Sequence, residues 1–492
     1  MPYPFALPTT SSFSFTACFE SDSHPSLPLR ANTFRGVAKD ALKKHKRLDP
    51  ASQVGHLPSV RTALLEYLPY VLALNAGLYD LPLPTGERIR VKPTAQPSIK
   101  WRPTLNGDFV QGRDRSRLRC HSLSQESAFV MSAIGFTYVL EARSALQPLY
   151  STNSEFLGAQ ERTTAISTAT KNLMSSASVF KWLSDTMVHT EKTSPHKDVN
   201  QKFFVDIAPS TVSAMASLSH AEATLLAVLK DDPYPAAVAQ DRNKNDKEWM
   251  FKSPEIPKVR ALLYARLCLA ASEHAARALS LAQSSVQEST KMDSNILKYM
   301  EDFRRVSRAK ACRFLGIDAE LGGQTADGIG WLQAGLQELG VDFKSSGKGL
   351  SLSSLKRELS EIMEDRRVDK EKAWGADAGR LEETRVIEML SGKWNKINDT
   401  MNTKPIPSIN TLLAKIPSGR EIHAIPDFQP PSLDRATLSN MQGAPDPNDD
   451  FVGDLSSEDE VLSPTGPAVG AFPGTKNSYS RSASTAPSTT YY

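Results

Sequence analysis

Residues 122–146, SLSQESAFVMSAIGFTYVLEARSAL, and 161–188, ERTTAISTATKNLMSSASVFKWLSDTMV, form the stretch that decides the fold. In both halves apolar residues recur at steps of about three and four, the period of a helix with a wide buried face. Pro148, Asn153 and Gly158 lie between them and end a helix without a long loop. We expect the two helices to pack antiparallel, with small residues such as Gly135 and Ser176 letting the backbones come close. Neither helix can bury its apolar face alone, so other helices must stack on the pair.

The rest of the chain continues this helical pattern. Apolar spacing predicts further helices within residues 57–79, 203–230, 259–283, 295–315, 328–339 and 355–397. Residues 88–105 differ, because apolar and basic residues alternate between prolines and glycines, and they predict a small β-excursion. Helix after helix without strand alternation predicts an all-α protein with a solenoid or tetratricopeptide-like core. No repeat of fixed period is present, so a strict tetratricopeptide array is not supported.

Composition narrows the function classes. The chain has 492 residues, 40% of them hydrophobic, and a formal net charge of +3, which argues against a protein whose main role is to neutralise nucleic-acid phosphates. The four cysteines are far apart with no CxxC pair, so we expect reduced thiols rather than a zinc site or a disulfide scaffold. No signal peptide or lipidation motif is recognised. Residues 127–140, the most apolar uncharged run, are too short to span a bilayer, which needs about 20 residues. We therefore expect an intracellular protein with at most peripheral membrane contact.

The last part of the chain has a different composition. From residue 426 the sequences PDFQPPSLDR and APDPNDDFVGDLSSEDEVLSPTGP are rich in proline and acidic residues and poor in large apolar ones. Such a segment cannot bury enough surface to fold. The sequence therefore predicts a folded domain at 1–425 and a disordered tail at 426–492. Near the other end, the basic cluster at 43–47 is read as a solvated helix end in preference to a membrane-binding patch.

Motifs for chemistry are missing from the sequence. It contains no HExxH, no GxxxxGK phosphate loop and no GxSxG elbow. Residues 316–323, GIDAELGG, place carboxylates beside glycines, but they lack the spacing of a calcium loop and are read as a turn between two helices. We expect no cofactor and no metal. A binding scaffold is therefore favoured over an α-helical enzyme that uses scattered His and Glu residues, although missing motifs do not exclude the enzyme.

Four segments resemble one family. SLSQESAFVMSAIGFTYVLEA, RTTAISTATKNLMSSASVFKWLSD, GIGWLQAGLQEL and NDTMNTKPIPSINTLLAKIPSGREIHAIPDFQPP are similar to the central helical pair, the last tetratricopeptide-type region and the closing strap of the Bro domain, the module of ALIX and its fungal relatives. The resemblance runs from the N-terminus to about residue 431. It implies a boomerang-shaped helical domain. The opening MPYPFALPTTSSFSF and the short chain after the domain resemble the fungal branch that acts in ambient alkaline-pH signalling.

The resemblance also implies a partner and a site. Bro domains bind the C-terminal amphipathic helix of the filament-forming ESCRT-III subunit in a hydrophobic groove. AEATLLAVL resembles the groove segment and places Leu225 at its aromatic position, and VRALLYARLCLAA places Leu263 and Leu267 at its two aliphatic positions, with Arg260 and Arg266 nearby. Leucines at this spacing equally suit a core. In the pH-signalling branch such binding supports proteolytic activation of a zinc-finger transcription factor. A general endosomal-sorting adaptor is the alternative.

Overall fold

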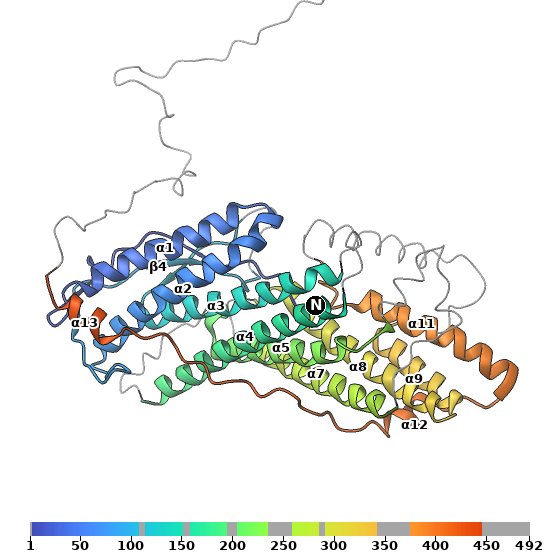
Figure 1. Cartoon of the computed structure of the whole chain (residues 1–492). Helices are drawn as coiled ribbons and strands as arrows, with labels where there is room; N and C mark the ends of the chain where they lie inside the picture. Colours follow the sequence, from blue (N-terminus) through green and yellow to red (C-terminus); the bar gives the residue numbers. More distant parts are fainter. Residues whose placement is uncertain are drawn as a thin grey trace, which may run out of the picture. The chain divides into compact units, whose positions relative to one another are not determined.

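The structure is a computed structural model, and it describes residues 2–107, 114–150, 158–193, 204–234, 258–284, 291–341 and 374–444. Within these ranges long helices dominate, in agreement with the predicted all-α class (Figure 1). They are α1 (Leu27–Arg47), α2 (Pro50–Leu78), α3 (Leu123–Leu146), α4 (Ala159–Thr193), α5 (Pro209–Leu229), α7 (Lys258–Ser284), α8 (Ser294–Leu321), α9 (Thr325–Glu338) and α11 (Arg380–Ile397). Short helical segments are η1 (Gln147–Leu149), η2 (Val205–Ile207), η5 (Asn398–Asn402), α12 (Ile409–Leu413) and α13 (Arg435–Met441).

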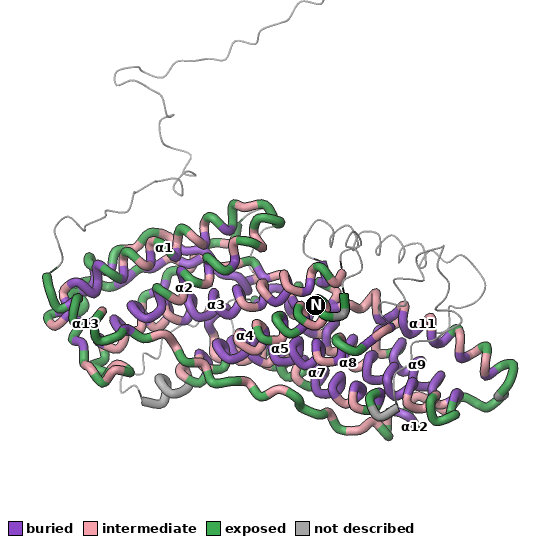
Figure 2. Tube along the Cα trace, viewed as in Figure 1, coloured by how far each residue is buried: buried purple, intermediate pink, exposed green. Residues whose placement is uncertain are grey.

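The long helices stack in chain order. Each from α1 to α9 packs against the next one described, and α11 packs on α9. Their buried faces join into one continuous hydrophobic core, and Figure 2 shows buried residues running through the whole stack. A stack of sequential neighbours is the arrangement of a helical solenoid, as the sequence predicts. Of the helix predicted over 355–397, residues 355–373 lie outside the described ranges.

The central pair forms as expected. Ser122 caps α3 by accepting a hydrogen bond from the Gln125 N–H. Gly135 on α3 faces Phe180 on α4 so closely that a Cβ at this position would lie 2.5 Å from the Phe180 ring. The small residue therefore lets the two helices approach, and the apolar side chains Phe136 and Phe180 pack edge to face across the contact at 5.5 Å.

The β-excursion is confirmed and is larger than predicted. Strands β1 (Thr9–Thr10), β4 (Ile99–Arg102) and β5 (Leu118–Cys120) form an antiparallel sheet in the order β1-β4-β5, with Thr9 opposite Arg102 and Ile99 opposite Cys120. A second pair joins β2 (Phe19–Ser21) to β3 (Val91–Pro93). The N-terminal strands were not predicted, because two or three residues carry too little alternation to recognise a strand.

Helix α5 is long and apolar enough to cross a membrane by length and composition alone, with a mean hydropathy of 1.4. However, 78% of that window is buried inside the protein, between α4 and α7. A helix covered on most sides by its neighbours has the composition of a core helix for that reason. The four cysteines are unpaired, as predicted, and all four are buried.

The compact unit extends beyond the predicted domain boundary at residue 425. Residues Met1–Phe451 form one compact unit, and Val452–Tyr492 are grouped apart from it. Beyond residue 425, Leu433, Leu438 and Met441 are buried, and the Ser26 hydroxyl donates to the Gly443 carbonyl at 2.7 Å. The sequence analysis missed these few buried apolar residues because the segment around them is rich in proline. The predicted disorder of residues 445–492 concerns a part outside the described ranges.

Residues 414–434, which we call the strap, connect α12 to α13. In Figure 1 the strap runs as an extended segment along the lower side of the stack. It contacts α7, α5 and α4 in turn through the residues described below, so it closes one side of the helical stack.

Candidate functional site

The three leucines assigned by resemblance lie at different depths. Leu225 on α5 and Leu267 on α7 are buried, with exposed fractions of 8% and 2%. Leu263 on α7 is half-buried and packs against the core. Leu225 adjoins a cavity of about 40 Å³, which it lines together with Leu226 and Glu222. A cavity of that size holds one or two water molecules and not a partner side chain. Their role as groove residues stays a prediction, and Leu263 is the one of the three that reaches the surface.

The solvent-facing edge of α7 begins next to Leu263. Leu262 is 42% exposed, and Arg260, two positions before it, is exposed as well. Arg266, the second arginine named beside the predicted groove residues, is held by the strap. Its Nε donates to the Ser418 carbonyl at 3.1 Å, and its carbonyl accepts from the Arg420 N–H at 3.0 Å. The apolar and basic surface available at this end of α7 is therefore Arg260, Leu262 and Leu263.

A histidine cluster lies where the strap crosses α5 and α7. The rings of His220 and His274 are 4.3 Å apart, His220 Nε2 lies 3.0 Å from the His423 carbonyl, and His274 Nε2 lies 3.7 Å from Glu421. Burial, followed by the charge of His220, lowers the pKa of both His274 and His423. Neutral imidazoles can pack this closely, whereas like charges would repel. The cluster therefore holds the strap against α5 and α7, with a lowered pKa at His274 and His423. The scattered histidines gave no sign of this cluster in the sequence.

The strap continues onto α4. Lys181 Nζ lies 3.6 Å from Asp427, and Phe428 packs edge to face on Trp182 at 6.0 Å. At its other end, Gly419 lies against α7, where a Cβ would come within 2.8 Å of the Ala270 backbone nitrogen. The strap thus touches three helices in succession and limits which of their surfaces a partner can reach.

Two buried ion clusters hold the stack together. Arg313 on α8 is fully buried and pairs with Asp232 at 2.6 Å and with Glu383 of α11 at 2.7 Å, while Lys310 also bonds Glu383. The nearby cations, Arg313 above all, hold the pKa of Asp232 below its usual value although burial alone would raise it. A second cluster centres on Glu126, described next. Each links elements distant in the chain, so spacing along the sequence could not reveal it.

Glu126 on α3 accepts hydrogen bonds from Arg35 of α1 at 3.0 Å and from Tyr67 of α2 at 2.9 Å, and from the Trp101 indole N–H of β4. Its side chain is completely buried. Every one of these donors comes from a different element, so the carboxylate ties the sheet to the first three helices. Both clusters bind the fold together, and their carboxylates Glu126, Asp232 and Glu383 are buried. Within the described residues, no group of three His, Cys, Asp or Glu side chains is placed to hold a metal ion.

Two curated proteins resemble the chain. It is 39% identical over 96% of its length to the pH-response regulator protein palC of Emericella nidulans, covering 99% of that protein. It is 24% identical to the palC of Cryptococcus neoformans var. neoformans serotype D, over 87% of this chain and 92% of that protein. No family model matches the chain.

A solved structure of ALIX agrees with the fold. A structure of ALIX in complex with the SIVmac239 PYKEVTEDL late domain superposes with a TM-score of 0.51 at 14% identity, over 87% of this chain and 49% of ALIX. A complex of ALIX BRO1 with CHMP4C gives a TM-score of 0.49 at 12% identity, over 88% of this chain and 96% of that one. With a helical stack of the Bro type and 39% identity to palC along nearly the whole sequence, the chain belongs to the palC family of fungal pH-response regulator proteins.

Proposed function

We propose that the chain is a non-enzymatic adaptor in ambient alkaline-pH signalling. It binds an ESCRT-III filament subunit and so supports proteolytic activation of a pH-responsive zinc-finger transcription factor. The observation that carries this proposal is the 39% identity to palC over 96% of the chain. The adaptor works in the cytoplasm, meets other pH-signalling components, and is recruited peripherally to cortical or endosomal membrane sites.

The partner's C-terminal amphipathic helix docks at the open end of α7. A docked helix is held by apolar anchors with charged groups around them that set its direction. Leu262 and Leu263 supply apolar surface there, and exposed Arg260 supplies a positive charge for an acidic partner helix. Leu225 and Leu267 support the docking site indirectly, because their buried side chains hold α5 and α7 in place.

A binding experiment tests the docking site. Leu262→Asp combined with Leu263→Ala is expected to weaken capture of the ESCRT-III C-terminal helix at least about tenfold. The melting temperature should fall only modestly, since Leu262 is exposed and Leu263 is half-buried. Leu81→Asp is the matched control, because Leu81 is 54% exposed and lies after α2. Leu263→Asp with Leu267→Asp is not a clean test, since a charge at buried Leu267 should unfold the chain. Equal binding by parent and double variant would remove α7 from the docking site.

The alternative is a general endosomal-sorting adaptor with the same groove. Growth separates the two roles. In a strain lacking the protein, the parent chain is expected to restore growth at alkaline pH, and the α7 variant is expected to fail. Normal alkaline growth in the deletion strain, together with a defect in delivery of membrane cargo to the vacuole, would favour the sorting role instead.

A further inference from the structure

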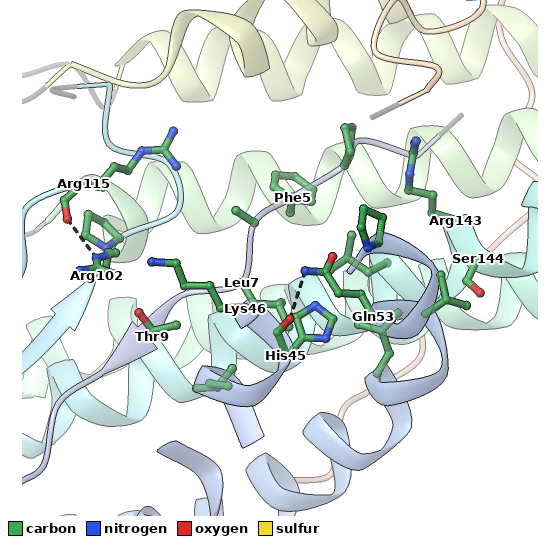
Figure 3. A pocket seen from close by; sticks show the side chains of 18 of the residues that line it. Phe5, Leu7, Thr9, His45, Lys46, Gln53, Arg102, Arg115, Arg143 and Ser144 are labelled. Atoms are coloured by element: carbon green, nitrogen blue, oxygen red, sulfur yellow. Dashed lines mark hydrogen bonds between the residues drawn. The ribbon is translucent and has the colours of Figure 1, made fainter. Parts of the chain in front are cut away.

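A large cavity lies far along the chain from the α7 residues. Its volume is about 640 Å³, within the range of about 300–1,000 Å³ typical of binding pockets. The N-terminal segment from Pro4 to Thr9 forms part of the wall, together with the end of α1, the start of α2, the sheet residues around Arg102, and the end of α3. Figure 3 shows the side chains of these different elements around one space.

Much of the cavity lining is apolar. Phe5, Leu42, Leu57 and Leu140 contribute to it, and Val54 on α2 adds a half-buried aliphatic side chain. Such a surface favours an apolar group of the occupant, because transfer of that group from water into an apolar cavity is favourable.

The two ends of the cavity are basic. Figure 3 places Arg102 and Arg115 at one end and Arg143 at the other, with Phe5 and Leu7 between them. Lys46 Nζ and Arg102 both reach Asp114, at 2.7 and 3.0 Å, so two cations share one carboxylate there. A hydrogen bond from Lys46 and the charges of Arg102 and Arg117 hold the pKa of Asp114 below its usual value. Arg115 also pairs with Asp293, which lies outside the lining. Among the residues that line the cavity, cations therefore exceed anions.

The remaining polar groups add no negative charge. Arg143 donates to the carbonyls of Pro2, at 2.8 Å, and Trp374, at 2.5 Å, and its guanidinium lies 4.1 Å from the centre of the Trp374 ring. Buried His45, whose carbonyl accepts from Gln53 at 3.0 Å, has no hydrogen-bond partner at Nδ1 in the described structure. Burial and the neighbouring His56 lower the pKa of His45 to about 4, so it is neutral near pH 7.

We propose that this cavity binds a short acidic peptide segment of another protein, with an apolar side chain in the middle and a carboxylate toward each basic end. The separation of the positive charges decides the class of ligand. A small inorganic anion would satisfy one end only and would leave the apolar middle empty. Single-stranded nucleic acid needs exposed aromatic platforms for its bases, and the apolar lining of this cavity is mainly aliphatic. A peptide with alternating functions fills both ends and the middle.

The test uses fluorescein-labelled nine-residue peptides and the full-length protein at about 150 mM salt, where the Debye length is about 8 Å and non-specific attraction is weak. The peptides carry Phe, Tyr, Trp, Leu, Ile, Val or Met at the central position, and Asp or Glu on both sides. In one matched set Asn and Gln replace the acidic residues, and in a second set Lys replaces them. In a third set Gly replaces the central residue. Fluorescence polarisation is expected to detect binding by members of the acidic apolar set. The binding affinity should be at least about tenfold lower in every matched set.

Two pairs of variants locate the binding. Lys46→Glu, at the basic end, should weaken binding about tenfold or more, whereas Lys44→Glu, on the same last turn of α1 but outside the lining, should change it less than about twofold. Val54→Asp should abolish binding, while Val37→Asp, at a 49% exposed residue of α1, should not. Melting temperatures of all four are compared with the parent.

Some outcomes would overturn the proposal. One is that no acidic apolar peptide binds. Another is that Lys46→Glu and Lys44→Glu lose affinity equally, and a third is that the affinity does not depend on the central residue of the peptide. The α7 variant Leu262→Asp should bind these peptides like the parent, so failure here and failure of the ESCRT-III proposal remain distinguishable.

Discussion

At the scale of single residues, buried charge explains most of the unusual chemistry. Arg313 can be buried because Asp232 and Glu383 neutralise it from two sides. Among the ion pairs of the described residues, none joins Glu222 on α5 to a cation. It accepts hydrogen bonds from the Tyr299 hydroxyl at 2.6 Å and from the Tyr3 N–H at 3.3 Å, and it is 3% exposed. Burial outweighs these bonds and raises its pKa to about 7.

This raised pKa predicts a pH-dependent stability. The folded chain holds a proton that the unfolded chain releases near pH 4.5, so the stability from Glu222 is complete below that pH and is lost as pH rises through about 7. Glu222→Gln keeps an oxygen for both donors and never ionises. The variant's melting temperature relative to the parent should therefore rise between about pH 5 and about pH 8, by the equivalent of on the order of 3 kcal/mol.

Glu20→Gln, at an exposed residue of β2, is the matched control and should show a flat difference. Thermal unfolding followed by circular dichroism at a series of pH values measures both. A difference for Glu222→Gln that falls with pH would mean that the carboxyl is ionised and stabilising in the fold.

At the scale of elements, the strap decides which helix faces are covered. Its contacts with α7 require the chain to pass directly over Ala270, and only a glycine at position 419 leaves room. A similar close approach of backbones occurs between α8 and α9. A Cβ added at Gly316 or at Gly328 would lie 3.1 Å from the carbonyl oxygen of the other glycine. Residues 316–321, predicted to form a turn, belong to α8 instead. The turn is made by Gly322 and Gly323, which follow the helix.

Gly419→Ala should displace the strap. We expect a loss of about 1–3 kcal/mol in unfolding free energy, because a Cβ there would meet the α7 backbone and cannot rotate away. The effect on the Arg266 and His220 contacts should appear as faster amide exchange at Arg420.

Gly392→Ala is the matched control. Gly392 is an exposed residue of α11 with no atom within 4 Å of an added Cβ, so the change should stabilise the chain by about 0.5–1 kcal/mol through helix propensity. Urea unfolding of the two variants gives the comparison. Equal stability of Gly419→Ala and the parent would mean that the strap passes α7 at a greater distance.

At the scale of the whole molecule, the folded unit extends past the strap. Leu438 and Met441 of α13 are buried, and the Ser26 N–H donates to the Met441 carbonyl at 3.3 Å, so the end of the strap is tied to the start of α1. Residues 426–444 therefore belong to the same hydrophobic unit as the helical stack.

Two truncations test this boundary. A chain ending at Ile425 should lose on the order of 3 kcal/mol or more, because Leu433, Leu438 and Met441 no longer cover the apolar surface beneath them. A chain ending at Phe451 should keep the melting temperature of the parent, because residues 452–492 are grouped separately. Equal melting of all three chains would restore the boundary at residue 425.

Local periodicity predicted the helices well for a physical reason. A helix repeats every 3.6 residues, so its buried face is written into short stretches such as residues 122–146, and α3 follows that pattern closely. The same logic could not place the candidate site. Spacing puts Leu263 and Leu267 on one side of α7, but it does not say that Leu267 is 2% exposed and Leu263 only half-buried. Burial depends on the neighbouring helices and on a strap about 150 residues away, Ser418 being 152 positions from Arg266.

The sequence by itself determined the positions of most of the long helices, α1 excepted, the small β-excursion, the unpaired cysteines and the resemblance to the Bro domain, because each depends on neighbouring residues or on matched segments. Only the tertiary structure decided that Arg266 is held by the strap, that Glu126 and Arg313 join distant elements, and that Phe5, Lys46, Arg102 and Arg143 surround one cavity. Those features depend on contacts between residues far apart in the chain. Such contacts form because the apolar faces of the helices must be buried together, and no local pattern records which surfaces then meet.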